Sequence, residues 1–293
     1  MNVVHTVSDL KAQLAAFRSN GCSIGLVPTM GALHAGHASL VRRSLIENDA
    51  TAVSIFVNPT QFNDQNDLDK YPRTLESDCQ LLTAVADEVA SEKGKESIIV
   101  VFAPSVEEIY PEPDTRQFSY PPTDTVMEGA FRPGHFNGVC QIVSKLFSFA
   151  EPTRAYFGEK DFQQIAVIRR MVDDKGFDLL LCPCPIVREA DGLALSSRNT
   201  LLSTDERQTA VNISHTLFES LEYAKNHTLE ETRQWVVSKI DKVEGLEVQY
   251  YNIVDGKSLQ DISSWDDSDD IVGCITVFCG HLPVRLIDNI RYK

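Results

Sequence analysis

The chain has 293 residues, of which 43% are hydrophobic and 24% charged, a composition that predicts one or two packed globular domains. It carries 27 Lys and Arg against 42 Asp and Glu, a formal net charge of -15, which disfavours a nucleic-acid partner because such binding depends on clustered cations. No apolar run approaches the roughly 18 to 20 residues of a membrane span, and no basic segment precedes an apolar one at the amino terminus, so neither a membrane segment nor a secretory signal is expected.

Short apolar or β-branched runs predict buried strands in the first 187 residues, and apolar residues at helical spacing predict helices between them. This alternation is typical of a parallel sheet covered by helices. Strands are expected at 23–27, 51–57, 98–102 and 154–157, with an extended segment at 177–187. Helices are expected at 37–47, 74–89, 137–150 and 161–174. The segment SEKGKES, residues 91–97, is interpreted as a polar turn.

From residue 188 onward, two helices precede the strands instead of alternating with them, which predicts a small separate α+β domain. Helices are expected at 204–226 and 229–243, and strands at 246–254, 271–279 and 283–287. Alternation along the first of these strands predicts one face made of Leu246, Val248, Tyr250, Asn252 and Val254. The predicted fold class is therefore α/β, with a Rossmann-like parallel sheet domain over residues 1–187 and a smaller α+β domain over residues 188–293.

Seven cysteines at irregular spacing indicate a reducing, cytoplasmic compartment rather than a disulfide framework. Cys182-Pro-Cys184 lacks a second pair at zinc spacing, and on an extended segment both side chains point to one face. We interpret the pair as ordinary strand residues, with a redox or metal role as the alternative. The acidic run between Asp266 and Asp270 is interpreted as a solvated loop, with cation binding as the alternative.

The first segment with chemical content is Pro28-Thr-Met-Gly-Ala-Leu-His34-Ala-Gly-His37, which leaves a predicted strand, crosses a glycine-bearing loop and enters a helix. Backbone amides, a helix N-terminus and two imidazoles are expected around one point, an arrangement suited to a triphosphate. Gly36 allows a ligand to approach the backbone closely. The alternative is a zinc site on the two histidines, which lacks a glutamate between them and a clear third ligand.

His-x-Gly-His after the first strand resembles the signature of the nucleotidyltransferase superfamily, which includes class I aminoacyl-tRNA synthetases and small adenylyl- and cytidylyltransferases. The longer string PTMGALHAGHASLV resembles the pantothenate synthetase family. Five further segments match that family in the same order: Phe56-Val-Asn-Pro-Thr-Gln-Phe62, Tyr71-Pro-Arg-Thr74, Arg132-Pro-Gly-His-Phe-Asn-Gly-Val139, Tyr156-Phe-Gly-Glu-Lys-Asp-Phe-Gln-Gln164 and Arg188-Glu-Ala-Asp-Gly-Leu-Ala-Leu-Ser-Ser-Arg-Asn199.

The resemblance implies ATP-dependent ligation of pantoate and β-alanine to pantothenate, through an enzyme-bound pantoyl adenylate and with release of pyrophosphate and AMP. It also implies Mg2+ on the ATP phosphates, whose protein ligands stay unassigned, and a homodimer. No Gly-x-Ser-x-Gly or Cys/His signature appears, so no protein nucleophile is expected. A reactive adenylate needs shelter from water, and the smaller domain is expected to act as a lid.

The same resemblance assigns roles to individual residues. ATP binding falls on Met30, His34, His37, Gly158, Lys160, Asp161, Val187, Ser196, Ser197 and Arg198. Pantoate binding falls on Pro28, Thr29, Met30, Gln61, Arg132 and Gln164, and His135 helps to order the site. The catalytic set is His34, His37, Lys160 and Arg198, whose donors and cations stabilise the charge that develops as pyrophosphate leaves. Taken singly, Gln61 and Gln164 also suit an exposed surface, and Lys160 a solvated loop.

Two features depart from the family pattern. SEKGKES looks like an insertion where the family has a shorter turn, so no metal ligand is assigned to Asp87 or Glu88, and Leu195 stands where Met is common. Three other functions compete. A transferase that adenylylates a phosphorylated metabolite is disfavoured because glutamines stand where extra basic residues are needed. An aminoacyl-tRNA synthetase is disfavoured by the net charge, and a non-catalytic nucleotide-binding regulator by the retained histidines and cations.

Overall fold

In the computed structural model, residues 1–62 and 65–293 are described, and they form two compact units. Unit 1 consists of Met1–Tyr120, Phe131–Glu159 and Val167–Pro185. Unit 2 consists of Pro121–Ala130, Lys160–Ala166 and Ile186–Lys293. Unit 2 thus joins two short segments from the first 187 residues to the carboxy-terminal region.

Unit 1 is built on a six-stranded sheet in the order β1-β4-β3-β2-β5-β6, and every neighbouring pair is parallel. This confirms the predicted Rossmann-like parallel sheet. The chain adds β3 and β4 on one side of β2 and then returns to place β5 on the other side, so β2 and β5 flank the switch point. The strands are β1 (Asn2–Val4), β2 (Ile24–Thr29), β3 (Ala50–Ile55), β4 (Ile98–Phe102), β5 (Arg154–Gly158) and β6 (Leu180–Cys184).

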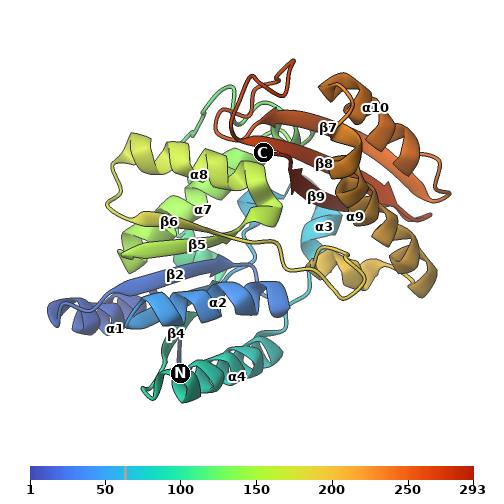
Figure 1. Cartoon of the computed structure of the whole chain (residues 1–293). Coiled ribbons are helices and arrows are strands. Elements are labelled where there is room, and N and C mark those ends of the chain that lie inside the picture. Colours follow the sequence, from blue (N-terminus) through green and yellow to red (C-terminus); the bar gives the residue numbers. More distant parts are fainter. Residues whose placement is uncertain (63–64) are drawn as a thin grey trace. The chain divides into compact units, whose positions relative to one another are not determined.

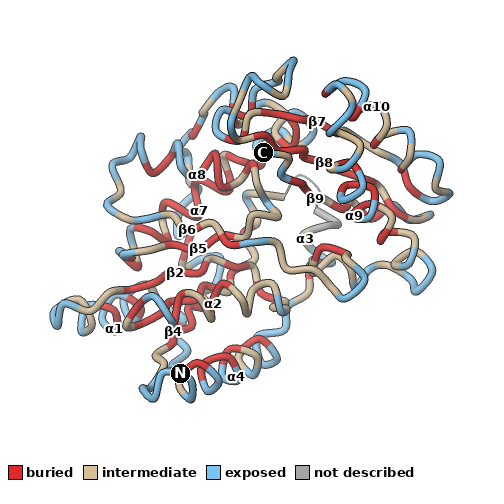
Figure 2. The backbone as a smooth tube through the Cα atoms, in the orientation of Figure 1, coloured by how far each residue is buried: buried red, intermediate tan, exposed pale blue. Residues whose placement is uncertain are grey.

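Helices cover both faces of this sheet. Figure 1 shows α2 (Ala35–Glu47) and α4 (Leu75–Lys93) together on one face, while α1 (Val7–Ser19) and α7 (His135–Ala150) pack together on the other. The four inner strands, β4, β3, β2 and β5, and the inner sides of the helices are mostly buried (Figure 2), as expected for parallel strands covered twice, whereas the edge strands β1 and β6 are partly exposed. The other helices of this region are α3 (Gln65–Lys70), α5 (Val106–Ile109), α8 (Phe162–Lys175), which continues from unit 2, and the short 3-10 helices η1 (Pro59–Gln61) and η2 (Glu159–Asp161).

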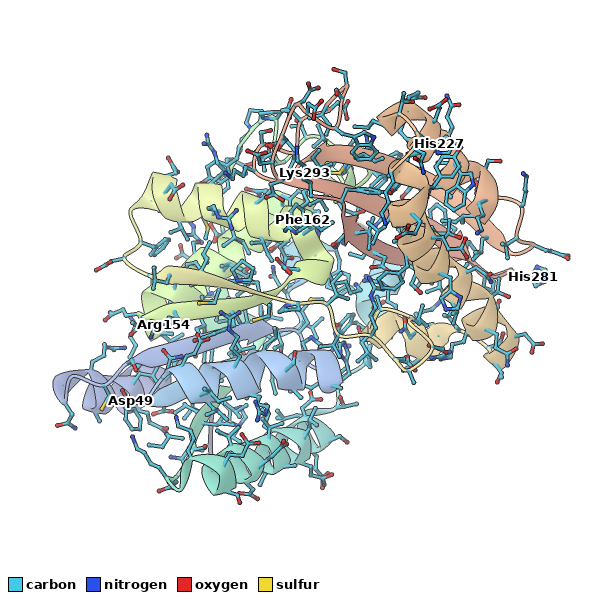
Figure 3. The ribbon with its side chains drawn as sticks, in the orientation of Figure 1. Asp49, Arg154, Phe162, His227, His281 and Lys293 are labelled. Carbon is cyan, nitrogen blue, oxygen red and sulfur yellow. The ribbon has the colours of Figure 1, made fainter. Side chains whose placement is uncertain are left out.

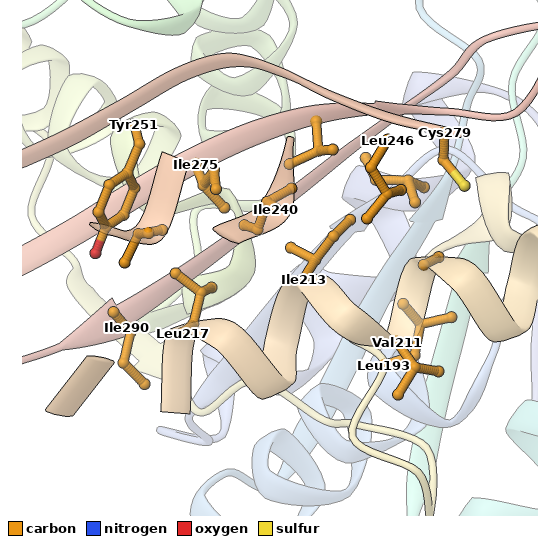
Figure 4. Close-up of a cluster of buried hydrophobic side chains, with 14 of the residues drawn as sticks. Leu193, Val211, Ile213, Leu217, Ile240, Leu246, Tyr251, Ile275, Cys279 and Ile290 are labelled. Carbon is orange, nitrogen blue, oxygen red and sulfur yellow. The ribbon is translucent and has the colours of Figure 1, made fainter. Parts of the chain in front are cut away.

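Unit 2 contains an antiparallel sheet in the order β7-β8-β9, formed by Leu246–Asp255, Ile271–Cys279 and Val284–Arg291. The helices α9 (Thr204–Ala224) and α10 (Leu229–Ile240) pack on it through an apolar cluster that includes Leu217, Ile240 and Ile275 (Figure 4). Both helices begin with a capping box, Ser203 with Glu206 and Thr228 with Glu231. The short elements α6 (Glu128–Phe131) and η3 (Ser197–Leu201) complete the unit. The expected α+β organisation of the carboxy-terminal region is confirmed.

The structure differs from the sequence-based expectations at three places. First, it contains the amino-terminal β1 and α1, for which the sequence patterns gave no prediction. Ser91–Lys93 of SEKGKES are helical rather than turn, because α4 continues until Gly94 ends it at a φ of +61°. The single apolar face expected for the first carboxy-terminal strand is also wrong. A bulge between Val248 and Tyr250 reverses the alternation, so Tyr251 joins the helix-facing cluster with Leu246 while Tyr250 packs elsewhere.

Cys182 and Cys184 both lie on β6 and pack into the same apolar cluster of unit 1, as the strand interpretation predicts. Burial raises the pKa of both thiols, and the Arg43 guanidinium donates a hydrogen bond to the sulfur of Cys184 at 3.4 Å. The acidic run lies in a loop, where Asp267 accepts from the amides of Ser263 and Ser264 at 2.8 and 2.9 Å. No helix within residues 1–62 and 65–293 has the length and apolar character needed to cross a membrane.

Candidate active site

In unit 1, the candidate residues gather where the parallel strands end at their carboxyl edge. Pro28 and Thr29 close β2, Gly158 closes the neighbouring β5, and Met30 opens the loop that leads to α2. Asp49 and Arg154, labelled in Figure 3, mark the opposite edge, where β3 and β5 begin. In doubly wound sheets the carboxyl edge at a switch point is where ligands bind, so the unit 1 residues lie where this fold places a ligand.

The loop after β2 is held by side chains that accept from consecutive backbone amides. The Thr29 hydroxyl donates to the Ser54 carbonyl at 2.6 Å and accepts from the Gly31 amide at 3.2 Å. The amides of Ala32 and Leu33 donate to the Asp78 carboxylate at 3.1 and 2.8 Å. These contacts change the expectation that the loop amides meet a triphosphate, because the amides of residues 31–33 are already satisfied within the protein.

His34 and His37 form a reciprocal cap at the start of α2. The Gly36 amide donates to Nδ1 of His34 at 3.1 Å, and the His34 amide donates to Nδ1 of His37 at 3.3 Å. A ring nitrogen that accepts from an amide carries no proton, so in the neutral form of each ring the proton is on Nε2. The ring centroids lie 4.1 Å apart. The local fold thus provides two neighbouring imidazole N–H donors, a chemistry suited to phosphate oxygens.

The side chain of Gln61 lies beside Met30, and its Nε2 donates a hydrogen bond to the Met30 sulfur at 2.9 Å. Asn58, which is buried, donates to the Gln61 side-chain oxygen at 3.2 Å. Arg132 donates to Nε2 of His135 at 3.2 Å, so in the neutral ring the proton of His135 is on Nδ1. From Nδ1 the ring donates to the backbone carbonyl of Gln61 at 2.9 Å. The structure therefore brings four residues of the predicted unit 1 set, Met30, Gln61, Arg132 and His135, into one connected group.

Gly138 explains how this group forms. A Cβ atom there would lie 2.3 Å from the Thr60 carbonyl oxygen and 2.8 Å from Cα of Gln61. Only glycine lets α7 approach η1 closely enough for His135 to reach Gln61. Asn58 and Asp78 were not assigned roles from the sequence. Asn58 lies inside the motif Phe56–Phe62, whereas Asp78 has only its spacing of four from Thr74 as a signal, and that spacing is common on helices.

In unit 2, Lys160 and Ser196 line one small cavity together with Asn199 and Asp288. The backbone carbonyl of Lys160 accepts from the Asn289 side chain at 3.2 Å. Ser196 caps η3 by accepting from the Arg198 amide at 3.3 Å, which places Ser197 and Arg198 in its first turn. Asp161 precedes α8, and Gln164 lies in its first turn. Val187 leads into the loop 188–195, and its carbonyl accepts from the Leu195 amide at 3.0 Å.

Buried ion pairs hold this part of unit 2 in place. Arg188 donates to both carboxylate oxygens of Asp288 at 2.6 and 2.8 Å, a bidentate pair that fixes the loop 188–195 against β9. Arg285 makes a second bidentate pair with the buried Glu128 at 2.5 and 2.6 Å. Burial opposes ionisation of Glu128, but the hydrogen bonds and charge of Arg285, helped by Tyr250, outweigh it and lower the pKa from 4.5 to about 2.

The neighbouring glutamines Gln163 and Gln164 differ in environment. Gln163 is buried, accepts from the Glu128 amide at 3.0 Å, and donates to the carbonyls of Thr123 and Val126, both at 2.8 Å. Gln164 is partly exposed, as a binding residue needs to be. Among the residues that the structure describes, no group of three or more His, Cys, Asp or Glu is arranged to hold a metal ion.

Comparison with known proteins adds independent observations. A family model described as pantoate-beta-alanine ligase matches residues 2–291 of the chain. The pantothenate synthetase of Bacteroides thetaiotaomicron is 62% identical over 293 residues, covering 100% of this chain and 99% of its own. Pantothenate synthetase from Thermus thermophilus superposes with a TM-score of 0.89 at 39% identity, covering 100% of this chain and 99% of its own. Pantoate-beta-alanine ligase from Francisella tularensis, solved with beta-gamma ATP and beta-alanine, gives a TM-score of 0.76 at 32% identity, covering 100% and 98%.

Proposed function

The chain belongs to the pantoate-beta-alanine ligase family, and we propose that it forms pantothenate through an enzyme-bound pantoyl adenylate. The pantoate carboxylate attacks the α-phosphorus of ATP, and the bond to the β-phosphate breaks to release pyrophosphate. The amine of β-alanine then attacks the acyl carbon, loses a proton, and displaces AMP. Activation is needed because an oxide or hydroxide is a poor leaving group, whereas AMP is a good one.

The observation that carries this proposal is the reciprocal cap at His34 and His37. Both rings have Nδ1 occupied by a backbone amide, so Nε2–H donation is built into the fold. We propose that these donors bind ATP phosphate oxygens and strengthen as charge builds on the leaving pyrophosphate. Lys160 and Arg198 supply positive charge to the same phosphates, in a chain whose net charge is -15. The remaining ATP contacts are proposed for Met30, Gly158, Asp161, Val187, Ser196 and Ser197.

Pantoate is proposed to bind at the group formed by Met30 and Gln61, with Gln164 as a second amide. Asn58 and the Met30 sulfur orient the Gln61 side chain. The backbone carbonyl of Gln61 accepts from His135, which in turn accepts from Arg132. Amides suit the hydroxyl groups of pantoate, and the Met30 side chain suits its dimethyl carbon. Pro28 and Thr29 are proposed to form the floor of this pantoate site. The Thr29 hydroxyl is already hydrogen-bonded to Ser54 and Gly31, and these bonds hold the floor in shape.

Magnesium is proposed to bind together with the ATP phosphates, where it would neutralise their charge. Mg2+ commonly keeps water and phosphate ligands with only one or two carboxylates. The chain's own part is to hold the phosphates with imidazole, ammonium and guanidinium donors.

We also propose a catalytic domain over residues 1–187, a lid over residues 188–293, a homodimer, and a cytoplasmic location. The seven free cysteines support a reducing compartment. A cross-link that prevents the two domains from moving should suppress turnover, and unchanged turnover would contradict the lid. A molar mass near 65 kDa, about twice the 32.7 kDa of one chain, is expected from light scattering, and a mass near that of one chain would contradict the dimer.

The deciding experiment follows AMP and pyrophosphate release by purified protein with ATP, magnesium and pantoate, with and without β-alanine. Steady AMP release that requires both acid and amine supports ligation through an adenylate. Pyrophosphate release that needs a phosphorylated metabolite instead would overturn the substrate assignment. Lys160→Ala should lower adenylate formation by about 10²-fold, whereas Lys257→Ala, an exposed lysine of the same unit, should leave it unchanged.

A further inference from the structure

We propose that Asp78 is a positioning residue for the reaction: its carboxylate holds the turn at residues 31–33 in the conformation that places Met30 and His34. This inference rests on the proposed function, which gives those two residues their roles. Asp78 itself lies on α4, far along the chain from the motif that it supports, and no substrate contact is proposed for it.

The carboxylate is buried and fully engaged. Only 2% of Asp78 is exposed. One oxygen accepts from the Ala32 amide at 3.1 Å, while the other accepts from the Leu33 amide at 2.8 Å and from the Thr74 hydroxyl at 3.2 Å. Within residues 1–62 and 65–293, the ion pairs include none between Asp78 and a lysine or arginine. A buried carboxylate is costly unless it is hydrogen-bonded, and here the compensation comes from the turn itself, through two of its amides.

The turn has a backbone conformation that requires such support. Gly31 and Ala32 have φ values of +82° and +49°, so two successive residues are left-handed. Alanine adopts this region at a steric cost that glycine avoids. Successive amides in such a turn converge and form a concave anion site, which Asp78 fills from within the protein. The carboxylate therefore compensates for the strain at Ala32.

The turn connects directly to the catalytic groups. Four consecutive amides, from Gly31 to His34, each donate to a side chain: Thr29, then Asp78 twice, then His37. Met30 precedes this run, and the His34 ring ends it by capping α2. Releasing the two central amides would leave the loop anchored only at its ends, so the path of the backbone from Met30 to the start of α2 at His34 would no longer be fixed. Displacements of about 1 Å at such a site can lower rates by about 10²-fold.

The matched variants are Asp78→Asn, Ala32→Gly and the double variant. Asparagine keeps the size of the side chain but turns an NH2 group toward an amide donor, so one loop amide loses its acceptor. Ala32→Gly removes the strain that Asp78 offsets, because glycine adopts the left-handed turn without help. We expect Asp78→Asn to lower kcat for adenylate formation about 10- to 100-fold, with a smaller change in KM for β-alanine, and the double variant to recover several-fold of that loss.

Each measurement is made well below the melting temperature, with circular dichroism confirming the fold. A folded Asp78→Asn protein whose kcat is within twofold of wild type would overturn the proposal, and so would a loss that Ala32→Gly leaves unchanged. If Asp78→Asn does not fold, Thr74→Val tests the same carboxylate more gently. It should lower kcat about threefold by the loss of one hydrogen bond, and an unchanged kcat would overturn the proposal. Wild-type protein is assayed first with pantoate and β-alanine. If it releases no AMP, the proposed function is wrong, and this result is distinct from a failure of the variants to change kcat.

Discussion

The two units hold their candidate residues by different physical means. In unit 1, short hydrogen bonds at the start of α2 are prominent: side chains of residues 29–37 cap one another's backbone, and the Asp78 carboxylate joins them from α4. In unit 2, the candidate residues lie on a framework fixed by long-range bidentate ion pairs, Arg188 with Asp288 and Arg285 with Glu128. The first arrangement sets the direction of a few donors, and the second holds distant chain segments together.

This difference teaches where substitutions should act. A hydrogen bond at a helix start contributes about 1 kcal/mol to stability, so changes there should appear more strongly in the rate of reaction than in the free energy of unfolding. Buried ion pairs are different, because removing one partner leaves the other charge buried without compensation. Changes at the ion pairs of unit 2 should therefore appear mainly in stability and in its dependence on pH.

Glu128→Gln gives the largest expected effect. The pKa of Glu128 falls from 4.5 to about 2 on folding, so its stabilisation is fully present above pH 4.5 and is lost as the pH falls toward 2. The shift corresponds to about 3 kcal/mol. Urea unfolding from pH 7 to pH 2.5 should show the variant less stable by about that amount at pH 7, and the difference should shrink to about 1 kcal/mol at pH 2.5. Glu244→Gln, at an exposed position, is the control, and a constant difference at all pH values would contradict this role.

His34→Ala and His34→Asn separate donation from capping. Both remove Nε2–H, and adenylate formation should fall about 10²-fold in each, equivalent to about 2.7 kcal/mol. Asparagine is a good helix N-cap, so only the alanine variant should lose about 1 kcal/mol of stability. Presteady-state release of pyrophosphate measures the first quantity and thermal unfolding the second. Recovery of the rate in the asparagine variant would mean that His34 acts through the helix start alone.

Arg188→Lys tests whether geometry matters in unit 2 beyond charge. Lysine keeps the positive charge but cannot form two parallel hydrogen bonds with Asp288, and it loses the stacking of the guanidinium on Phe218, whose ring centre lies 4.9 Å away. We expect a loss of about 2 kcal/mol in denaturant unfolding. Arg233→Lys, in an exposed pair on α10, should change stability by less than about 0.5 kcal/mol. Equal effects in the two variants would show that the buried pair contributes no more than a surface one.

Sequence patterns predicted the parts of the fold whose cause is local. β-branched runs such as residues 98–102 marked the buried strands, and the order of strands and helices separated the parallel sheet from the carboxy-terminal sheet. The bulge at Gln249 escaped prediction, because an inserted residue leaves no break in an apolar and aromatic run. The extension of α4 to Lys93 escaped it too, since Ser91–Lys93 carry no apolar residue to continue the helical pattern.

The candidate site was predictable only where residues adjacent in the chain act together. His34 and His37 lie one helical turn apart, so their pairing follows from the sequence. The contact of Arg132 and His135 with Gln61 depends on the close approach of α7 to η1 at Gly138, which spacing along the chain does not encode. Asp78 belongs to the same class, because it reaches the motif from 45 residues away. Resemblance to a family indicates which residues matter, and tertiary packing decides how they are held.

The smallest expected effect on the reaction is at Gln164, and its neighbour Gln163 on α8 provides a direct comparison between a proposed binding residue and a buried structural one. Gln164→Ala removes one proposed hydrogen bond to pantoate, so KM for pantoate should rise about tenfold, equivalent to about 1.4 kcal/mol, with an unchanged melting temperature. Gln163→Ala removes the partner of the Glu128 amide and of the Thr123 carbonyl and leaves the Val126 carbonyl with the Gly129 amide alone, so it should lower the melting temperature. Because the two residues are adjacent on one helix, any effect on α8 itself is common to both variants. An unchanged pantoate KM in Gln164→Ala would remove that residue from the binding site, whatever its neighbour does.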